Sequence, residues 1–119
     1  MRIPAGFHSV TPRIVVEGAD RFIEFLARVF GATGTWETSR PSQIQIGDSL
    51  LLISEAGERE AFPAFLYVYV EDVDAVFARA VEAGAEVLEA AGQTPYGDRR
   101  AMVRDAWGNV WQIAAPAAK

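Results

Sequence analysis

One order of elements occurs twice in this chain, and this repeat limits the possible fold more than any other feature of the sequence. Each half begins with a β-branched or aromatic run, continues through an acidic turn into an amphipathic helix, and ends in further strand-like segments. The letters repeat too: Val16-Glu17 corresponds to Val70-Glu71, and Gly31-Ala32 to Gly84-Ala85, at an offset of about 54 residues. The pattern predicts an α+β fold built from two strand–helix–strand–strand–strand modules.

The first module is expected over about residues 9–54. Its opening strand is predicted over Val10–Val16, and a helix follows that ends before Gly31. Three more strands are predicted around Thr35–Thr38, Ser42–Ile46 and Ser49–Ser54. The helix should bury an apolar face formed by Phe22, Phe25, Leu26, Val29 and Phe30.

The second module is expected over about residues 63–115, after a polar linker at about 55–62. Its strands are predicted over Phe65–Val70, Glu86–Ala90, Arg100–Arg104 and Asn109–Ala114. The helix of this module should bury Val73, Val76, Phe77, Ala80 and Val81. Because a single helix covers only one face of such a sheet, the other face has to be covered by the second module, another chain or a ligand.

The composition limits the classes of molecule that this chain is expected to bind. The chain has 16 acidic and 11 basic residues, for a net charge of -5, which argues against nucleic acid and suits a neutral or cationic small ligand. An acidic surface that only maintains solubility is the alternative. The absence of cysteine and the single histidine argue against a strong transition-metal site. No run resembles a signal peptide or a membrane span, so we expect a cytoplasmic protein without a membrane partner.

Short motifs occur in a fixed order along the chain: Thr11-Pro12, Phe30-Gly31-Ala32, Ile46-Gly47-Asp48-Ser49, Val70-Glu71-Asp72-Val73-Asp74, Tyr96-Gly97-Asp98-Arg99 and Asp105-Ala106-Trp107-Gly108-Asn109-Val110-Trp111. In this order they resemble the vicinal-oxygen-chelate superfamily of glyoxalase, bleomycin-resistance and dioxygenase proteins, over roughly residues 9–115. The resemblance implies a single domain over residues 1–119, in which two βαβββ modules form a curved mixed sheet with the helices on its outer face.

The resemblance also implies where a metal ion would be bound. Metal-dependent members of the superfamily use four side chains, usually His, Glu or Gln, at positions that correspond here to Thr11, Leu52, Phe65 and Gln112. Only Gln112 is a plausible ligand, because a hydroxyl, an isobutyl and a benzyl group cannot hold a divalent transition ion. We therefore expect no metal and no other cofactor.

The expected binding site is aromatic. Phe65, Tyr67 and Tyr69 alternate along one strand and should share a face toward the cavity, where they either contact a ligand or simply fill space. In the resembled family, the second strand and the loop before the last hairpin border this cavity, which adds further candidates. The predicted ligand-binding residues are Trp36, Phe65, Tyr67, Tyr69, Tyr96, Arg99 and Gln112.

Three side chains have alternative roles. Arg99 either binds an acidic ligand group or pairs with Asp98 or a surface carboxylate in a structural role. Arg13 either anchors a ligand or pairs with a carboxylate such as Glu37, and the second is slightly favoured because an unpaired inner-strand charge is costly. Trp111 has the opposite strand parity to Gln112 and should lie in the core beneath a helix.

Three functions fit these features. The favoured one is a metal-free protein that sequesters an aromatic or cationic drug-like compound, as bleomycin-resistance members of the resembled family do. An alternative is a lyase, isomerase or dioxygenase-type enzyme that is either metal-free or has a degenerate, weak metal site at Gln112. The third is an accessory domain without a tight ligand. A symmetric homodimer is expected, because each module leaves a sheet face half covered.

Overall fold

The computed structural model describes residues 2–117, which form two helices and seven strands. The chain divides into two compact units, the first ending at Phe62 and the second beginning at Pro63. Neither helix has the length and apolar character that a membrane crossing demands. The predicted α+β fold with a repeated module is confirmed, and its strands are divided between two mixed sheets.

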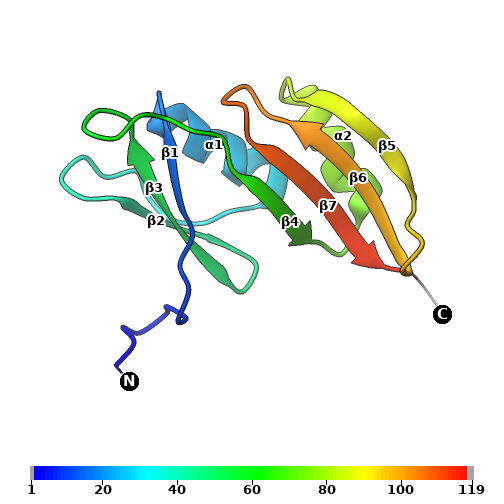
Figure 1. Ribbon diagram of the computed structural model, residues 1–119, viewed down its shortest axis with the longest axis horizontal. Coiled ribbons are helices and arrows are strands. Elements are labelled where there is room, and N and C mark those ends of the chain that lie inside the picture. Colours follow the sequence, from blue (N-terminus) through cyan, green and yellow to red (C-terminus); the bar gives the residue numbers. More distant parts are fainter. Residues whose placement is uncertain (1, 118–119) are drawn as a thin grey trace. The chain divides into compact units, whose positions relative to one another are not determined.

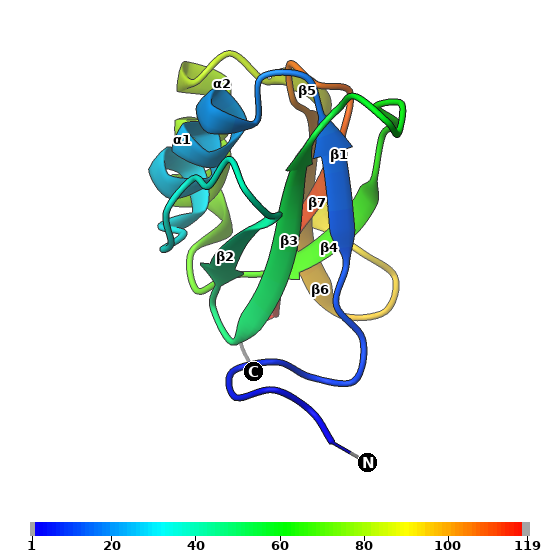
Figure 2. The same ribbon diagram turned by 90° about the vertical axis from the view of Figure 1, so that its left-hand side faces the viewer.

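The first unit contains β1 (Arg13–Val16), α1 (Ala19–Phe30), β2 (Ser42–Ile46) and β3 (Ser49–Glu55). The sheet order is β1-β3-β2, with β1 parallel and β2 antiparallel to the central β3 (Figures 1 and 2). The opening strand is shorter than predicted, so Val10 and Thr11 precede it. Strand β1 lies within its predicted range, and α1 ends before Gly31 as predicted. Strands β2 and β3 are joined through a turn at Gly47, whose φ of 56° is left-handed.

Helix α1 forms because apolar residues recur at a spacing close to the helical period. Its C-terminal cap is Gly31, whose φ of 68° suits glycine, and the Gly31 amide donates to the Ala27 carbonyl. The predicted apolar face is confirmed, since its members are buried except for the half-exposed Phe30. The helix buries Ala19, Phe22, Ile23, Phe25, Leu26 and Val29.

The N-terminus of α1 is held by a residue from the end of β3. The residue at the N-cap position, Gly18, has no side chain with which to cap the helix. The Glu55 carboxylate takes over this role and accepts hydrogen bonds from the Gly18 and Ala19 amides, each at 2.9 Å. A carboxylate at this end is stabilised by the free amides and by the helix dipole.

Replacing Glu55 with alanine is expected to lower the free energy of unfolding by about 1 kcal/mol, the usual cost of losing a helix cap. Urea unfolding followed by circular dichroism measures this change. Glu60→Ala is the matched control, because Glu60 is also exposed and lies outside any helix or strand. Equal stability of the two variants would contradict the capping role of Glu55.

The strand predicted over Thr35–Thr38 does not form. This segment is a loop, and the nearest pairing is an isolated bridge between Thr33 and Gln45. Gly34 explains the departure: its φ is 123°, and a Cβ built there would lie 2.4 Å from the Gln43 carbonyl oxygen. The backbone therefore leaves the strand path at Gly34 in a conformation that only glycine readily adopts, despite the β-propensity of the threonines that follow.

The second unit contains β4 (Phe65–Tyr69), α2 (Val73–Glu82), β5 (Glu86–Gln93), β6 (Asp98–Arg104) and β7 (Val110–Pro116). The sheet order is β4-β7-β6-β5, with β4 parallel to β7 and the other pairs antiparallel. In Figure 1, α2 lies against one face of this sheet. Strand β6 starts two residues earlier than predicted, which brings Asp98 and Arg99 from the expected loop into the sheet.

The core of the second unit lies between α2 and its sheet. Trp111 is fully buried, as its strand parity predicted, and its neighbour two residues along, Ile113, is buried with it. On α2, Val73, Val76 and Ala80 are buried. Since successive strand residues point to opposite faces, the residues that alternate with Trp111 and Ile113 lie on the face away from α2.

Candidate ligand-binding site

The face of the second sheet away from α2 carries the predicted aromatic residues of β4. Tyr67 pairs with Gln112 of β7, which pairs in turn with Met102 of β6, and Met102 pairs with Glu89 of β5. These four residues form one row across all four strands. A polar amide, a thioether and a carboxylate thus stand beside an aromatic ring on a single face.

Asp98 lies at the centre of the hydrogen bonding on this face. Its Oδ2 accepts a 2.6 Å hydrogen bond from the Tyr67 hydroxyl and a 2.9 Å bond from the Tyr69 hydroxyl. The two tyrosines on β4 reach β6 across the intervening β7, where Tyr69 pairs with Ala114, a residue too small to obstruct them. The tyrosine rings lie 5.3 Å apart between centroids, tilted by 56°.

A second set of hydrogen-bonded side chains, Tyr96, Arg100 and Glu89, lies beside the set around Asp98. The Tyr96 hydroxyl accepts a 2.6 Å hydrogen bond from Arg100, whose guanidinium also binds Glu89 at 3.1 Å. Arg100 is therefore compensated by a carboxylate of the protein. We use the name tyrosine face for Tyr67, Tyr69, Tyr96 and Asp98 together.

The tyrosine face alters the acidity of two of its hydroxyls. Burial, followed by the hydrogen bond to Asp98, raises the pKa of Tyr67 far above its ordinary value. The hydrogen bond to Asp98 is the main cause that raises the pKa of Tyr69. Both hydroxyls therefore stay protonated at neutral pH and act as hydrogen-bond donors.

Tyrosinate absorbance gives a direct test of this arrangement. Tyr67 and Tyr69 should ionise above the usual tyrosine pKa of about 10, and Asp98→Asn should return both toward that value. Since their folded pKa values are raised, their contribution to stability is complete below about pH 10 and is lost as pH rises through the folded values. A wild-type titration with all three tyrosines at the ordinary value would contradict the assignment.

The predicted site residues are only partly brought together. Tyr67, Tyr69 and Gln112 share the face away from α2, and Phe65 has the same strand parity, with 67% of its surface exposed. Arg99 faces the other way: its guanidinium binds the Asp74 carboxylate of α2 through two hydrogen bonds of 2.8 and 3.1 Å. The alternative that pairs Arg99 with a surface carboxylate is thus what the structure shows.

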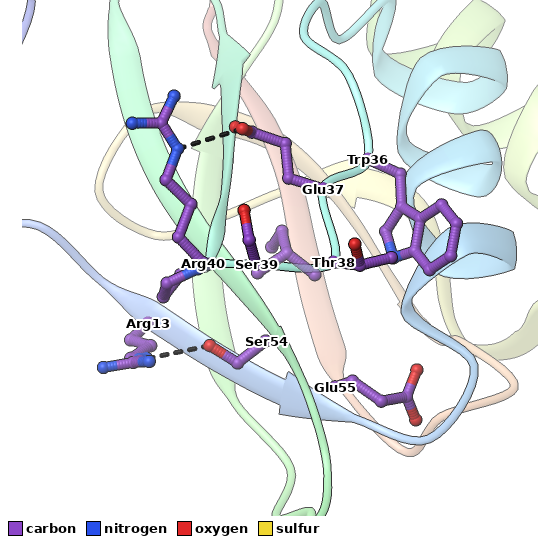
Figure 3. Close-up of a pocket in the computed structure, with 10 residues that line it drawn as sticks. Arg13, Trp36, Glu37, Thr38, Ser39, Arg40, Ser54 and Glu55 are labelled. Atoms are coloured by element: carbon purple, nitrogen blue, oxygen red, sulfur yellow. Dashed lines mark hydrogen bonds and ion pairs between the residues drawn. The ribbon is translucent and has the colours of Figure 1, made fainter.

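Trp36 lies in the first unit, on the loop that replaces the predicted strand. It lines a pocket of about 330 Å³ together with Arg13 and Glu37 (Figure 3). The favoured pairing of Arg13 with Glu37 is not formed, because Glu37 binds Arg40 at 2.9 Å while the Arg13 Nε donates to the Ser54 hydroxyl at 2.8 Å.

The positions implied for a metal ion do not supply suitable donors. Phe65 and Gln112 are not partners in the sheet, because Phe65 pairs with Val110 and Gln112 with Tyr67. Across residues 2–117, no three His, Cys, Asp or Glu side chains are grouped so that they could hold an ion. With Thr11 and Leu52 at the other two positions, the residues present do not fit a divalent metal.

Three polar residues of the candidate site were missed from the sequence: Asp98, Arg100 and Glu89. Asp98 was expected in a loop, where strand parity says nothing about direction. Ala101 and Val103 of β6 are buried toward α2. Because β6 begins at Asp98, Asp98 and Arg100 have the opposite strand parity to these two residues and lie on the face away from α2. The bulges that shift the register of β5 hid the matching position of Glu89.

Comparison with known families agrees with this architecture. Residues 6–113 match the family model described as the Glyoxalase/Bleomycin resistance protein/Dioxygenase superfamily. The chain belongs to this superfamily. Among curated proteins, the uncharacterized protein Mb0911c of Mycobacterium bovis is 27% identical over 126 aligned residues, which cover 91% of this chain and 83% of that protein.

Solved structures show the same fold. TioX from Micromonospora sp. ML1 has a TM-score of 0.76 at 24% identity, with 94% of this chain and 98% of that chain covered. The fosfomycin resistance protein FosX from Listeria monocytogenes, solved with Mn(II) and sulfate, has a TM-score of 0.74 at 16% identity, with 98% and 93% covered. At these identities the likeness establishes the fold of this superfamily member.

Proposed function

We propose that this protein is a small-molecule binding protein that holds an aromatic ligand with a cationic group on its tyrosine face, without a metal ion. The observation that carries the proposal is the Asp98 carboxylate, which is 8% exposed and surrounded by tyrosines. Both tyrosine hydroxyls bind Oδ2, and within the described chain no other group donates to this carboxylate. Oδ1 is thereby left for a donor on a ligand.

The surrounding surface supports an aromatic partner. Phe65, Tyr69 and Tyr96 are each more than 60% exposed, although large aromatic residues are usually covered. Aromatic faces bind flat apolar groups and attract cations, and the negative charge of Asp98 adds to this attraction. Arg100 does not oppose a cation, because its charge is compensated by Glu89.

Superfamily membership fits a role in sequestering a drug-like compound, since the superfamily includes bleomycin resistance proteins. The metal-dependent alternative has weaker support here, because the donor set does not fit a divalent ion. We therefore favour binding over lyase, isomerase or dioxygenase chemistry.

Calorimetric titration of the purified protein with three aromatic probes tests the proposal. Para-nitrobenzyl-trimethylammonium should bind at least roughly tenfold more tightly to wild type than neutral para-nitrobenzyl alcohol does, because only the cation gains the carboxylate. Equal affinities, or no binding of either probe, would refute a cation-selective site. Para-nitrobenzoate serves as the charge-reversed probe, and it should bind the tyrosine face more weakly than the alcohol does, because the Asp98 carboxylate repels an anion.

The metal-free part of the proposal has its own measurement. Melting temperatures with Mn²⁺, Ni²⁺ or Zn²⁺ should match those with a chelator, because only a ligand that binds the folded state raises stability. A rise of several degrees with one of these ions, together with that ion in elemental analysis of the protein, would overturn the proposal in favour of a metal-dependent enzyme.

The homodimer expected from the sequence stays a prediction. The exposed side chain of Phe65, which is not one of the four residues of the tyrosine face, leaves apolar area on this unit that a second copy of the chain would cover. Sedimentation velocity at micromolar concentration should show a mass near twice that of the chain. A monomer under these conditions would contradict the dimer without affecting the tyrosine face as a binding site.

A further inference from the structure

The two oxygens of the Asp98 carboxylate differ in what they can still bind. Both tyrosine hydrogen bonds end on Oδ2, and no group within residues 2–117 donates to Oδ1. In this part of the chain, every fully buried side-chain nitrogen or oxygen atom has a hydrogen-bond partner. Since Oδ1 has none, it must contribute to the 8% of Asp98 that is exposed. A molecule in solution can therefore reach Oδ1.

The contacts of Asp98 also fix the direction of this oxygen. The Asp98 amide donates to the Thr94 hydroxyl at 2.9 Å, and the Asp98 carbonyl accepts from the Thr94 amide at 2.7 Å. The tyrosine hydroxyls hold Oδ2 in addition. Because the backbone and one carboxylate oxygen are both held, Oδ1 is oriented before a ligand binds, which lowers the entropy lost on binding.

The tyrosines indicate how far from an aromatic ring the donor of a ligand should lie. Their own donors are hydroxyls bonded directly to a ring, and the ring of Tyr69 is largely exposed. A ligand ring that packs against Tyr69 can reach the same carboxylate with a donor that is one or two bonds from the ring. The geometry thus favours a short connection between the ring and the donor.

A positively charged N–H group is the donor that Oδ1 should bind most strongly. Hydrogen bonds between ionised partners are short, about 2.7–2.9 Å for N⁺–H···O⁻, and roughly twice as strong as those between neutral groups. A quaternary ammonium group has no N–H, and its methyl groups hold the charge farther from the oxygen. Charge alone therefore uses only part of what this carboxylate offers.

We infer that the tyrosine face selects aromatic amines whose protonated nitrogen carries at least one N–H group and lies one or two bonds from the ring, with Oδ1 of Asp98 as the acceptor. Protonated arylmethylamines belong to this class, and quaternary ammonium compounds do not. The inference rests on the proposed function, which requires only a cation, and adds the requirement for a donor.

A series of methylated probes separates the donor from the charge. Para-nitrobenzylamine and its N,N-dimethyl derivative both have N–H groups when protonated, whereas para-nitrobenzyl-trimethylammonium has none. Calorimetric titration at a pH at which all three are charged should give similar affinities for the first two, because Oδ1 needs one donor. The trimethyl compound should bind at least roughly tenfold more weakly. A loss that is no larger at the last methyl group than at the earlier ones would overturn the inference.

Two variants assign this difference to Asp98. In Asp98→Asn the carbonyl stays with the tyrosines, so the amide NH₂ group replaces Oδ1 and opposes a ligand donor. The dimethyl and trimethyl compounds should bind this variant alike, and a difference that persists in the folded variant would contradict the role of Oδ1. Asp74→Asn removes the same charge from the α2 side and should keep the difference.

The probes also distinguish failure of this inference from failure of the proposed function. If the proposed function is wrong, the trimethyl compound binds wild type no better than neutral para-nitrobenzyl alcohol. If only the donor requirement is wrong, the dimethyl and trimethyl compounds bind equally and both bind more tightly than the alcohol.

Discussion

Replacing Asp105 with alanine is expected to lower the free energy of unfolding by about 3–5 kcal/mol, the largest effect on stability among the substitutions considered. Asp105 is 4% exposed in the turn between β6 and β7. Its carboxylate accepts hydrogen bonds from the Trp107 and Asn109 amides, each at 2.9 Å, and from the Trp111 indole at 2.8 Å. The Asn109 side-chain amide donates to it as well.

The cost is large because the donors that remain are buried. Asn109 and Trp111 have no exposed surface, so water cannot replace the missing carboxylate. Asn109 also accepts a 2.9 Å hydrogen bond from the Ala64 amide, which fixes the chain just before β4. Loss of Asp105 should therefore loosen the start of the strand that carries the tyrosines.

Urea unfolding, followed by circular dichroism and tryptophan fluorescence, measures this effect. Asp105→Asn should lower the free energy of unfolding by less, about 2 kcal/mol, because the asparagine carbonyl still accepts hydrogen bonds from the backbone amides. A cost remains because the asparagine amide group, itself a donor, faces another donor. Asp48→Ala is the control, since Asp48 is exposed in a turn and should change stability by less than about 0.5 kcal/mol. A change as small as this at Asp105 would contradict its role.

Replacing Asp98 with asparagine is expected to weaken binding of the cationic probe by roughly 30-fold, the largest effect on the proposed function. The asparagine carbonyl can still accept hydrogen bonds from Tyr67 and Tyr69, so the face keeps its shape and loses only its charge. The neutral alcohol should bind the variant as it binds wild type. Calorimetry of both probes on both proteins provides the comparison.

The matched control is Asp74→Asn, which removes the same charge from the α2 side of the second unit. Asp74 is 63% exposed in its side chain and pairs with Arg99, so its loss should change stability little. The Arg99 guanidinium holds the pKa of the Asp74 carboxyl below its ordinary value, and this carboxyl is therefore charged at neutral pH. If the two variants weaken cation binding equally, general electrostatics and not the tyrosine face accounts for the selectivity.

The architecture could be predicted from the sequence because each helix and most strands follow from patterns of neighbouring residues. The apolar spacing from Phe22 to Val29 sets the buried face of α1, and the alternation of Trp111 with Gln112 sets which of them enters the core. Each pattern needs only neighbouring residues. The repeat then adds the order of elements, and this order was enough to identify the superfamily.

The candidate site could be predicted only in part. The alternation of Phe65, Tyr67 and Tyr69 correctly separated these residues from the aliphatic side chains between them, but it gave no partner for the hydroxyls. Whether a ligand contacts them stays a prediction. The motif that contains Arg99 predicts a ligand contact, but the partner of Arg99 in the structure is Asp74, which lies 25 residues away on a helix.

Tertiary structure decided two further features. The strand predicted over Thr35–Thr38 is absent because Gly34 approaches the Gln43 carbonyl, a contact that no local propensity reveals. Asp98 meets Tyr67, 31 residues away in the sequence, because β4 and β6 flank the same strand, β7, in the sheet. The sequence by itself thus determined the repeated α+β architecture and the aromatic strand. Strand order and register, which depend on contacts between distant segments, decided where the charges lie.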